Sequence, residues 1–150
     1  MRRALFLTAV LVACATDEVP ETDTAAAMTD TGAATLTAAD VAGTWTGQSM
    51  AMDGDSVTSR WTLHSTAEGA AHLMLEGSTD TINYTTTFAG DSLVAVSEQY
   101  TTPDMPNTPV TFRSVGRMEG DMLRGTVEIR LASNPDSIIA RERWESRRAP

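Results

Sequence analysis

From Gly43 onward the chain consists of short runs in which apolar and polar residues alternate, and turn residues separate one run from the next. Alternation with a period of two is typical of strands that bury one face, and Gly-Asp pairs between such runs are typical of tight hairpins. The candidate strands cover residues 44–52, 57–66, 71–76, 81–88, 92–101, 109–119, 122–132 and 138–147. No helical pattern of useful length interrupts them, so the sequence predicts an all-β meander.

The Gly-Asp turns also predict strand register, because residues directly opposite each other in a hairpin share one face of the sheet. A two-residue turn at Gly120-Asp121, a second at Gly90-Asp91 and a three-residue turn over 67–69 each give a mainly apolar or small face. The pairs are Met118–Leu123, Gly116–Gly125, Ser114–Val127, Phe112–Ile129, Val110–Leu131, Phe88–Leu93, Tyr84–Ser97, Leu63–Leu73 and Trp61–Leu75. Three hairpins therefore share one apolar face.

The three tryptophans lie on the first, second and last candidate strands, at Trp45, Trp61 and Trp144. They meet only if the last strand pairs with the first, and closure also removes the sheet edges that promote aggregation. We therefore predict a closed eight-stranded antiparallel up-and-down barrel over residues 43–150, with an open β-sandwich as the alternative. At least one pair of indoles should then lie with ring centroids within about 7 Å, and Gly47 would leave room for a nearby indole.

Gly43-Thr44-Trp45 at the start of the first strand resembles the Gly-x-Trp motif of lipocalins and avidins. The resemblance implies a barrel whose Trp packs at the closed end beneath an Arg from the last strand, for which Arg141 and Arg143 are candidates. The longer Gly43–Gly47 segment resembles the start of nitrobindin-type haem barrels, which bind haem through a late histidine. This chain has no His after His72, and the biotin contacts of avidins find no counterpart, so no cofactor is expected.

The first residues have the pattern of a bacterial lipoprotein signal. Met1-Arg2-Arg3 is positive, residues 4–12 are apolar apart from one Thr, and Leu11-Val12-Ala13-Cys14 resembles a lipobox. The resemblance implies a signal peptide over 1–13 and a lipid on Cys14, the residue that carries diacylglycerol and usually a second acylation such as palmitate. The alternative is that Cys14 is an ordinary buried thiol in a helix.

Lipidation would tie the protein to a membrane on the extracytoplasmic side of the cell envelope, because two or more acyl chains anchor stably. In the lipoproteins that this segment resembles, Asp after the Cys favours retention at the inner membrane. Here Ala15 follows the Cys, so the resemblance implies the outer membrane in organisms that have one. Residues 14–42 are rich in Ala, Thr and acids, and those from 15 to 40 include six acids and no base. This composition predicts a disordered tether, at whose end Thr37 and Asp40 imitate a helix capping box.

Composition excludes several classes of function. The chain carries 11 basic and 20 acidic residues for a net charge of −9, which argues against nucleic-acid binding. It has no Lys and one Cys, so a P-loop, a Schiff base, a disulfide framework and a Cys-based zinc site are excluded. No Ser or Thr has a supporting base, so we expect no enzyme activity and name no catalytic residue.

Five residues are candidates for binding a small ligand inside the barrel. Glu142 shares a face with Trp144 on the last strand, so it would be a costly buried carboxylate unless a partner or ligand meets it. The full set is Trp45, Trp61, Tyr84, Glu142 and Trp144. Space for a ligand would come from small inward residues, which are Gly47, Ser49, Ala95, Ser97, Ser114, Gly116 and Gly125.

Other polar features have ordinary explanations beside functional ones. His64 and His72 oppose each other on the outer face, but a third metal ligand is lacking, so no metal site is expected. Arginines gather in the last three strands. Arg113 opposes Glu128, so a cross-strand ion pair is expected there, and Arg117 opposes Arg124, so that these two repel each other unless Glu119 or Asp121 screens them. Such a face could dock an anionic surface or an acidic partner. Residues 101–109 contain three prolines and are expected to form a stiff loop beside the barrel mouth.

Two functions remain open. The first is a lipid-anchored barrel that binds a small apolar or amphipathic ligand. The alternative is a structural, inhibitor-like or interaction module of the envelope, with a protein partner and a filled core. Interior volume separates them, because ligand cavities are usually about 300 Å³ or larger.

Overall fold

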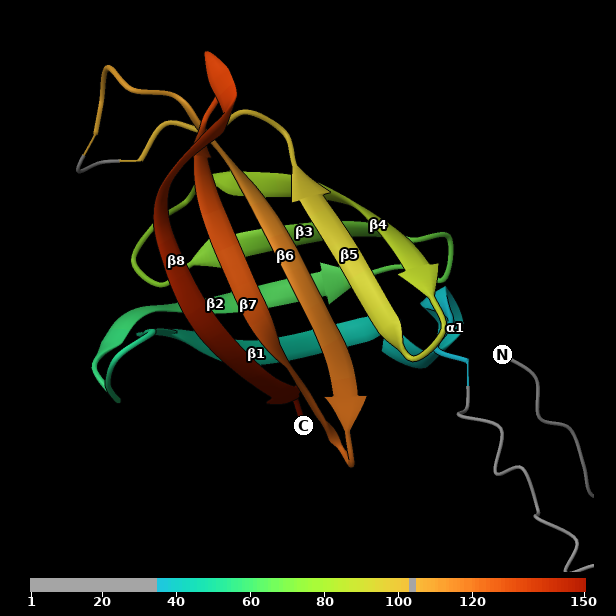
Figure 1. Ribbon diagram of the computed structural model, residues 1–150. Helices are drawn as coiled ribbons and strands as arrows, with labels where there is room; N and C mark the ends of the chain where they lie inside the picture. The colour runs from blue at the N-terminus through green and yellow to red at the C-terminus, as the bar shows by residue number, and fades with distance from the viewer. Residues whose placement is uncertain (1–34, 103–104) are drawn as a thin grey trace, which may run out of the picture. The chain divides into compact units, whose positions relative to one another are not determined.

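Eight strands form a closed antiparallel barrel in the computed structural model, which describes residues 35–102 and 105–150 (Figure 1). Each strand is hydrogen-bonded to the next, and β8 closes the ring against β1. The elements are α1 (Ala38–Val41), β1 (Gly43–Ala51), β2 (Val57–Ser65), β3 (Ala70–Leu75), β4 (Thr81–Ala89), β5 (Ser92–Ser97), β6 (Val110–Glu119), β7 (Met122–Leu131) and β8 (Asn134–Arg148). The predicted up-and-down barrel is confirmed, and the sandwich alternative is wrong.

The registers predicted from the turns are confirmed in all three hairpins. Gly116 opposes Gly125, Phe88 opposes Leu93, and Trp61 opposes Leu75, together with the other predicted pairs. Most strand ends lie at or within one residue of the predicted bounds, and two ends differ by four residues. β5 ends at Ser97 because Tyr100 makes only an isolated bridge, and β8 begins at Asn134, where register irregularities in β7 extend the pairing.

The up-and-down order gives the barrel two different ends. The turns after β2, β4 and β6 lie at one end, and the connections after β1, β3, β5 and β7 lie at the other. α1 lies across the first of these ends, which we call the closed end (Figure 1). The opposite end is called the mouth, and the proline-rich connection between β5 and β6 lies there as expected.

The closed end is plugged by residues that the sequence analysis assigned to the tether. Leu36 is 7% exposed and Val41 is 3% exposed, and both belong to the barrel core. The Leu36 amide donates to the Gly90 carbonyl at 2.8 Å. Residues 35–42 are therefore part of the folded domain, which corrects the boundary set at residue 43. The rest of the predicted tether, the signal peptide and Cys14 lie outside the described residues.

The short helix α1 has the capping interaction that the sequence indicated. The Thr37 amide donates to Asp40 Oδ2 at 2.9 Å, and the Thr37 hydroxyl donates to the same oxygen at 2.6 Å. These two hydrogen bonds lower the pKa of Asp40 below its usual value. Helix capping thus fixes the segment that closes the barrel.

Trp45 forms the floor of the barrel and is fully buried. Its Nε1 donates to the Val41 carbonyl at 2.8 Å, and the guanidinium of Arg148 lies 4.6 Å from its ring centroid. Arg148 also donates to the carbonyls of Ala42 at 2.6 Å and Asp40 at 2.5 Å. The Arg over this Trp is therefore Arg148.

The expectation for Arg141 or Arg143 in this position is wrong. Antiparallel pairing of the first and last strands brings the start of β1 to the end of β8, so that Trp45 opposes Arg148. Arg141 and Arg143 lie on the half of β8 nearer the mouth and form ion pairs with Glu128 and Asp55 on the outside. None of the described helices is long and apolar enough to cross a membrane.

The predicted indole cluster is confirmed for one pair of tryptophans. The ring centroids of Trp61 and Trp144 are 6.2 Å apart, with an interplanar angle of 68°. The pair spans β1, which lies between β2 and β8 and contributes Gly47 beneath the Trp61 ring. A Cβ at Gly47 would lie 2.3 Å from Trp61 Cη2, so this glycine does leave the room that the indole needs.

Candidate ligand cavity

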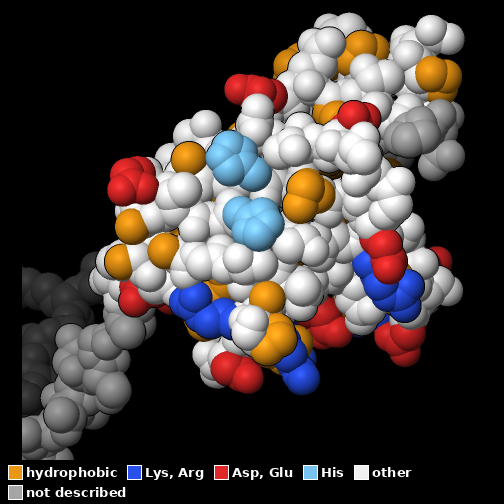
Figure 2. Space-filling model, turned by 180° about the vertical axis from the view of Figure 1, so that it is seen from behind, with side chains coloured by type: hydrophobic (Ala, Val, Ile, Leu, Met, Phe, Trp, Pro, Cys, Tyr) orange, Lys and Arg blue, Asp and Glu red, His pale blue; other side chains and the backbone are white. Residues whose placement is uncertain are grey.

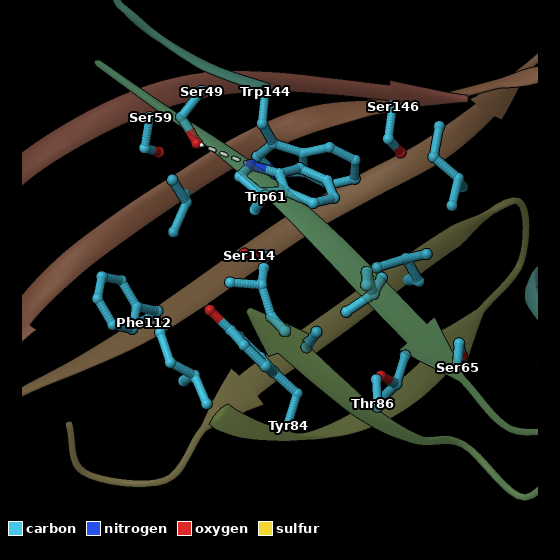
Figure 3. A pocket seen from close by; sticks show the side chains of 18 of the residues that line it. Ser49, Ser59, Trp61, Ser65, Tyr84, Thr86, Phe112, Ser114, Trp144 and Ser146 are labelled. Atoms are coloured by element: carbon cyan, nitrogen blue, oxygen red, sulfur yellow. Dashed lines mark hydrogen bonds between the residues drawn. The ribbon is translucent and has the colours of Figure 1, made fainter. Parts of the chain in front are cut away.

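A cavity of about 120 Å³ lies inside the barrel (Figure 3). Aliphatic side chains such as Leu63, Leu73 and Leu123 form much of its wall. Its aromatic residues are Trp61, Tyr84, Phe112 and Trp144. The interior is therefore neither filled nor as large as the roughly 300 Å³ typical of cavities for drug-sized ligands.

Glycines leave less open space than the sequence analysis expected, because indoles occupy the room beside them. Trp61 covers Gly47, and Trp144 covers Gly116 and Gly125. A Cβ at Gly116 would lie 2.5 Å from Trp144 Cζ2, and one at Gly125 would lie 2.8 Å from the same atom. The expectation that these three glycines line free volume is wrong, and this explains the small cavity.

The remaining small residues divide into two groups. Ser49, Ala95 and Ser114 line the cavity as expected. Ser97 does not, because its hydroxyl donates to the Glu98 carbonyl at 2.7 Å and accepts the Phe112 amide at 2.8 Å. Ser97 therefore holds the mouth ends of β5 and β6 together.

Four of the five candidate ligand residues line the cavity, namely Trp61, Tyr84, Glu142 and Trp144. Trp45 does not line the cavity, because it lies below it in the floor of the barrel. Trp61 Nε1 already donates to Ser49 Oγ at 3.3 Å, as the dashed line in Figure 3 marks. Trp61 therefore offers a ligand only its ring.

Inward positions of β8 place three polar groups along one side of the cavity. Glu142, Trp144 and Ser146 all line it, at a spacing of two residues or roughly 6.7 Å. Trp144 Nε1 and Ser146 Oγ are buried and have no hydrogen-bond partner among residues 35–102 and 105–150. Glu142 is half-buried and forms no ion pair within the described part of the chain.

Tyr84 adds a hydroxyl from the opposite side of the barrel. In Figure 3 its hydroxyl points toward the space between Phe112 and Ser114. Burial raises the pKa of Tyr84 far above the ordinary value of a phenol, because the phenolate would lose its hydration. Tyr84 therefore remains a neutral hydrogen-bond donor at physiological pH.

Acidic residues surround the mouth. They lie in the connections after β1, β3 and β5 and at the start of β8, and all are exposed: Asp53, Asp55, Glu76, Asp80, Glu98 and Asp136. These connections carry no basic side chain in their described residues. Asp55 pairs with Arg143 and Glu98 accepts from Asn83 at 3.0 Å, whereas the other four form no ion pair with a described residue.

The two histidines lie side by side on the outer surface of β2 and β3 (Figure 2). The side chain of His64 is hydrogen-bonded to Thr44 Oγ1 at 3.0 Å, and that of His72 to Asn83 Oδ1 at 2.8 Å. No cluster of three or more His, Cys, Asp or Glu side chains suited to a metal occurs among residues 35–102 and 105–150. The pair is thus satisfied by polar neighbours.

Acids offset most of the arginines on the outer wall. Glu119 pairs with Arg117 at 3.0 Å and with Arg124 at 3.1 Å, so it screens the opposed arginines as the sequence suggested. These hydrogen-bonded partners lower the pKa of Glu119. Arg113 does oppose Glu128, but no ion pair joins them.

Glu128 is instead occupied by two other arginines. Arg130 on the same strand is its hydrogen-bonded ion-pair partner, and Arg141 on β8 lies at 3.2 Å. Both lower the pKa of Glu128, Arg130 more strongly. The expected Arg113–Glu128 ion pair is therefore wrong, because nearer guanidinium groups take both carboxylate oxygens.

A second hollow, of about 490 Å³, lies on the outer wall across β1, β2, β7 and β8. It contains Arg60, Arg124 and Arg147 beside Glu145. Arg124 pairs with Glu145 at 3.6 Å, while Arg60 and Arg147 form no ion pair within the described residues. The outer groove therefore holds three arginines and one glutamate.

Sequence reasoning missed Ser146 and the acidic mouth. Side chains two residues apart in a strand point to the same face, so Ser146 shares the face of Glu142 and Trp144 on β8. This alternation alone could have identified Ser146 as an inward residue. The acids of the mouth belong to three separate connections and to the start of β8, and only the barrel topology brings them together. No protein-family model, curated protein or solved structure matches this chain.

Proposed function

We propose that this protein is a lipid-anchored, extracytoplasmic binding protein whose barrel holds one small amphipathic ligand. The anchor is supported by the sequence Leu11-Val12-Ala13-Cys14 behind a positive, then apolar, N-terminal segment. Acylated Cys14 would hold the barrel at the membrane of the cell envelope. Binding without catalysis is proposed, because the cavity offers no nucleophile with a base beside it.

One observation carries the ligand proposal: two residues that line an apolar cavity carry buried polar atoms without a hydrogen-bond partner among the described residues. Trp144 Nε1 is a donor only, and it remains unpaired together with the Ser146 hydroxyl. An unsatisfied buried group costs about 1–3 kcal/mol, so native structures rarely retain one without a reason. A ligand with an apolar body and a hydrogen-bond acceptor would satisfy these groups when it binds.

The size of the cavity limits the ligand. An engineered protein cavity of about 150 Å³ binds benzene, so 120 Å³ suits a body of about one small ring or a short branched chain. A larger molecule would have to extend through the mouth. The ligand is therefore proposed to be small, with any further polar group near Glu142.

Benzyl alcohol tests this proposal because it combines one ring with one hydroxyl. We expect it to change the fluorescence of Trp61 and Trp144 saturably in the purified protein. Trp144→Phe keeps the aromatic bulk but removes the donor, and Ser146→Ala removes the hydroxyl; each should weaken binding roughly three- to tenfold. Ser92→Ala is the matched control, because Ser92 lies outside the cavity and bonds Asp91.

Native mass spectrometry of the full chain extracted from its own membrane provides the second test. We expect a small retained adduct that Trp144→Phe weakens. A barrel that carries no adduct and shows no response to millimolar benzyl alcohol would contradict the proposal.

The outer groove favours a second candidate function, docking to an anionic surface. Arg60 and Arg147 lie there without acidic partners, and unpaired arginines attract phosphate and carboxylate groups. Co-sedimentation of the unlipidated protein with phosphatidylglycerol vesicles tests this function. Arg60→Gln with Arg147→Gln should reduce binding, while Arg141→Gln, which removes an arginine paired with Glu128, should not.

A further inference from the structure

We propose that the ligand of this cavity is a small organic cation, with an ammonium group near the mouth and an apolar body inside. This inference rests on the proposed ligand-binding function and adds the charge of the ligand. Three features of the described residues support it: an aromatic wall, an unpaired carboxylate, and an acidic mouth.

The aromatic wall is suited to a cation. Trp61, Tyr84, Phe112 and Trp144 line the same cavity, and the two indoles are in edge-to-face contact at 6.2 Å. The negative faces of aromatic rings attract ammonium groups, and Trp does so most strongly. Trp61 Nε1 is held by Ser49, so the orientation of its ring is fixed before a ligand arrives.

Glu142 supplies a counter-charge inside the barrel. Its cross-strand neighbours are Ala51 on β1 and Val127 on β7, and neither can neutralise it. The adjacent Arg141 and Arg143 lie on the outer face, where they pair with Glu128 and Asp55. The carboxylate that lines the cavity is therefore available to an ammonium group and would repel an anionic ligand.

The position of Glu142 suits a ligand that has an ammonium group at one end and an apolar body at the other. It lies one inward position closer to the mouth than Trp144, or roughly 6.7 Å along β8. This distance is about the length of one ring with a short linker. An ammonium group at Glu142 would therefore place the apolar body beside the indole of Trp144, within reach of Ser146.

The acidic residues around the mouth also attract cations from the surrounding solution. Asp53, Glu76, Asp80 and Asp136 are exposed and unpaired within the described residues, and no basic side chain lies in the described parts of the mouth connections. Carboxylates around a concave opening concentrate cations and speed their entry. β6 begins near the mouth and carries Arg113, which has no acidic partner among the described residues. Arg113 lies on the outer face, opposite Val96 and Glu128, so it does not line the cavity.

Three probes of one size separate charge from shape: benzylammonium, benzyl alcohol and benzoate. Binding is followed by tryptophan fluorescence at pH 7 and constant ionic strength. We expect benzylammonium to bind roughly tenfold more tightly than benzyl alcohol, and benzoate to bind most weakly. The affinity for benzylammonium should also fall as salt is added, whereas that for benzyl alcohol should not.

Glu142→Gln tests the carboxylate with almost no change of shape. The variant should lose the preference for benzylammonium while its affinity for benzyl alcohol stays within twofold of that of the original protein. Glu145→Gln is the matched control: it removes the same charge three positions along the same strand, but from the outer face, where Glu145 bonds Gln48 and Arg124. It should retain the preference.

The possible outcomes distinguish this inference from the function on which it rests. Equal or tighter binding of benzoate, or an unchanged preference in Glu142→Gln, would overturn the cation proposal and leave a neutral-ligand cavity. If Glu142→Gln fails to fold, the salt dependence in the original protein decides, and its absence overturns the proposal. If none of the three probes binds, the ligand-binding function fails as well.

Discussion

The indole of Trp61 lies edge-on to the indole of Trp144, although their strands β2 and β8 do not pair with each other. β1 lies between them and contributes Gly47, over which the Trp61 ring passes. On the other side, Gly116 and Gly125 accommodate Trp144. Residues without a Cβ thus allow two large side chains to occupy the middle of a narrow barrel, and this arrangement determines the shape of the cavity.

Gly47→Ala should destabilise the protein by about 1–3 kcal/mol, because the new Cβ would overlap the Trp61 ring. The ring would have to move away from β1, and its hydrogen bond to Ser49 would weaken. Urea denaturation measures the loss of stability. Gly54→Ala is the control, since a Cβ there meets nothing within 4 Å; equal stability of the two variants would contradict the packing account.

Arg148→Gln should loosen the closed end and cost about 1–2 kcal/mol. The change removes a cation–π contact with Trp45 and the two hydrogen bonds to Ala42 and Asp40. Amide hydrogen exchange should then accelerate at Leu36, whose amide is bonded to Gly90. Arg147→Gln, which changes the exposed neighbour, should leave both measurements nearly unchanged.

Stability should fall at alkaline pH because of Tyr84. Burial raises its folded-state pKa, so this group's contribution to stability is fully present below the unfolded pKa of about 10 and is lost as pH rises above it. Urea denaturation at pH 9 and pH 11 measures the change. Tyr84→Phe should reduce the loss of stability, whereas Ser114→Ala, which keeps the phenol, should not; an identical slope in Tyr84→Phe would contradict the assignment.

Cys14→Ser tests the proposed anchor. Because acylation requires the thiol, the variant should remain an unprocessed precursor without acyl mass and should leave the membrane fraction. Mass spectrometry and fractionation report these properties. An unmodified Cys14 in the mature original protein would show that the lipobox assignment is wrong.

The sequence was sufficient to predict the barrel, because the turn residues, the alternation within strands and the positions of the tryptophans all indicated the same fold. Two-residue turns such as Gly120-Asp121 determined the hairpin registers, and the alternation beside them indicated the same inward face. The tryptophans of the first and last strands then favoured closure over an open sandwich. A fold is predictable when the local preferences of turns and strands agree with the long-range packing of side chains.

The errors concern side chains whose partners depend on three-dimensional placement. Leu36 looked like a lone apolar residue in a polar tether, but the closed end of the barrel supplies the apolar surface that buries it. Arg148 could have been identified over Trp45 from the antiparallel pairing of β1 and β8. The glycines were expected to create free space, whereas packing filled that space with the two indoles.

Residues 35 and 149 both leave the barrel at the closed end, since Leu36 bonds Gly90 and Ala149 bonds Thr44 there. The mouth lies at the opposite pole. If the N-terminal segment is attached to a surface, the attachment enters the barrel at the pole opposite the mouth. Immobilisation at the N-terminal side would for the same reason leave solutes free access to Glu142, which makes the protein well suited to surface-based binding measurements.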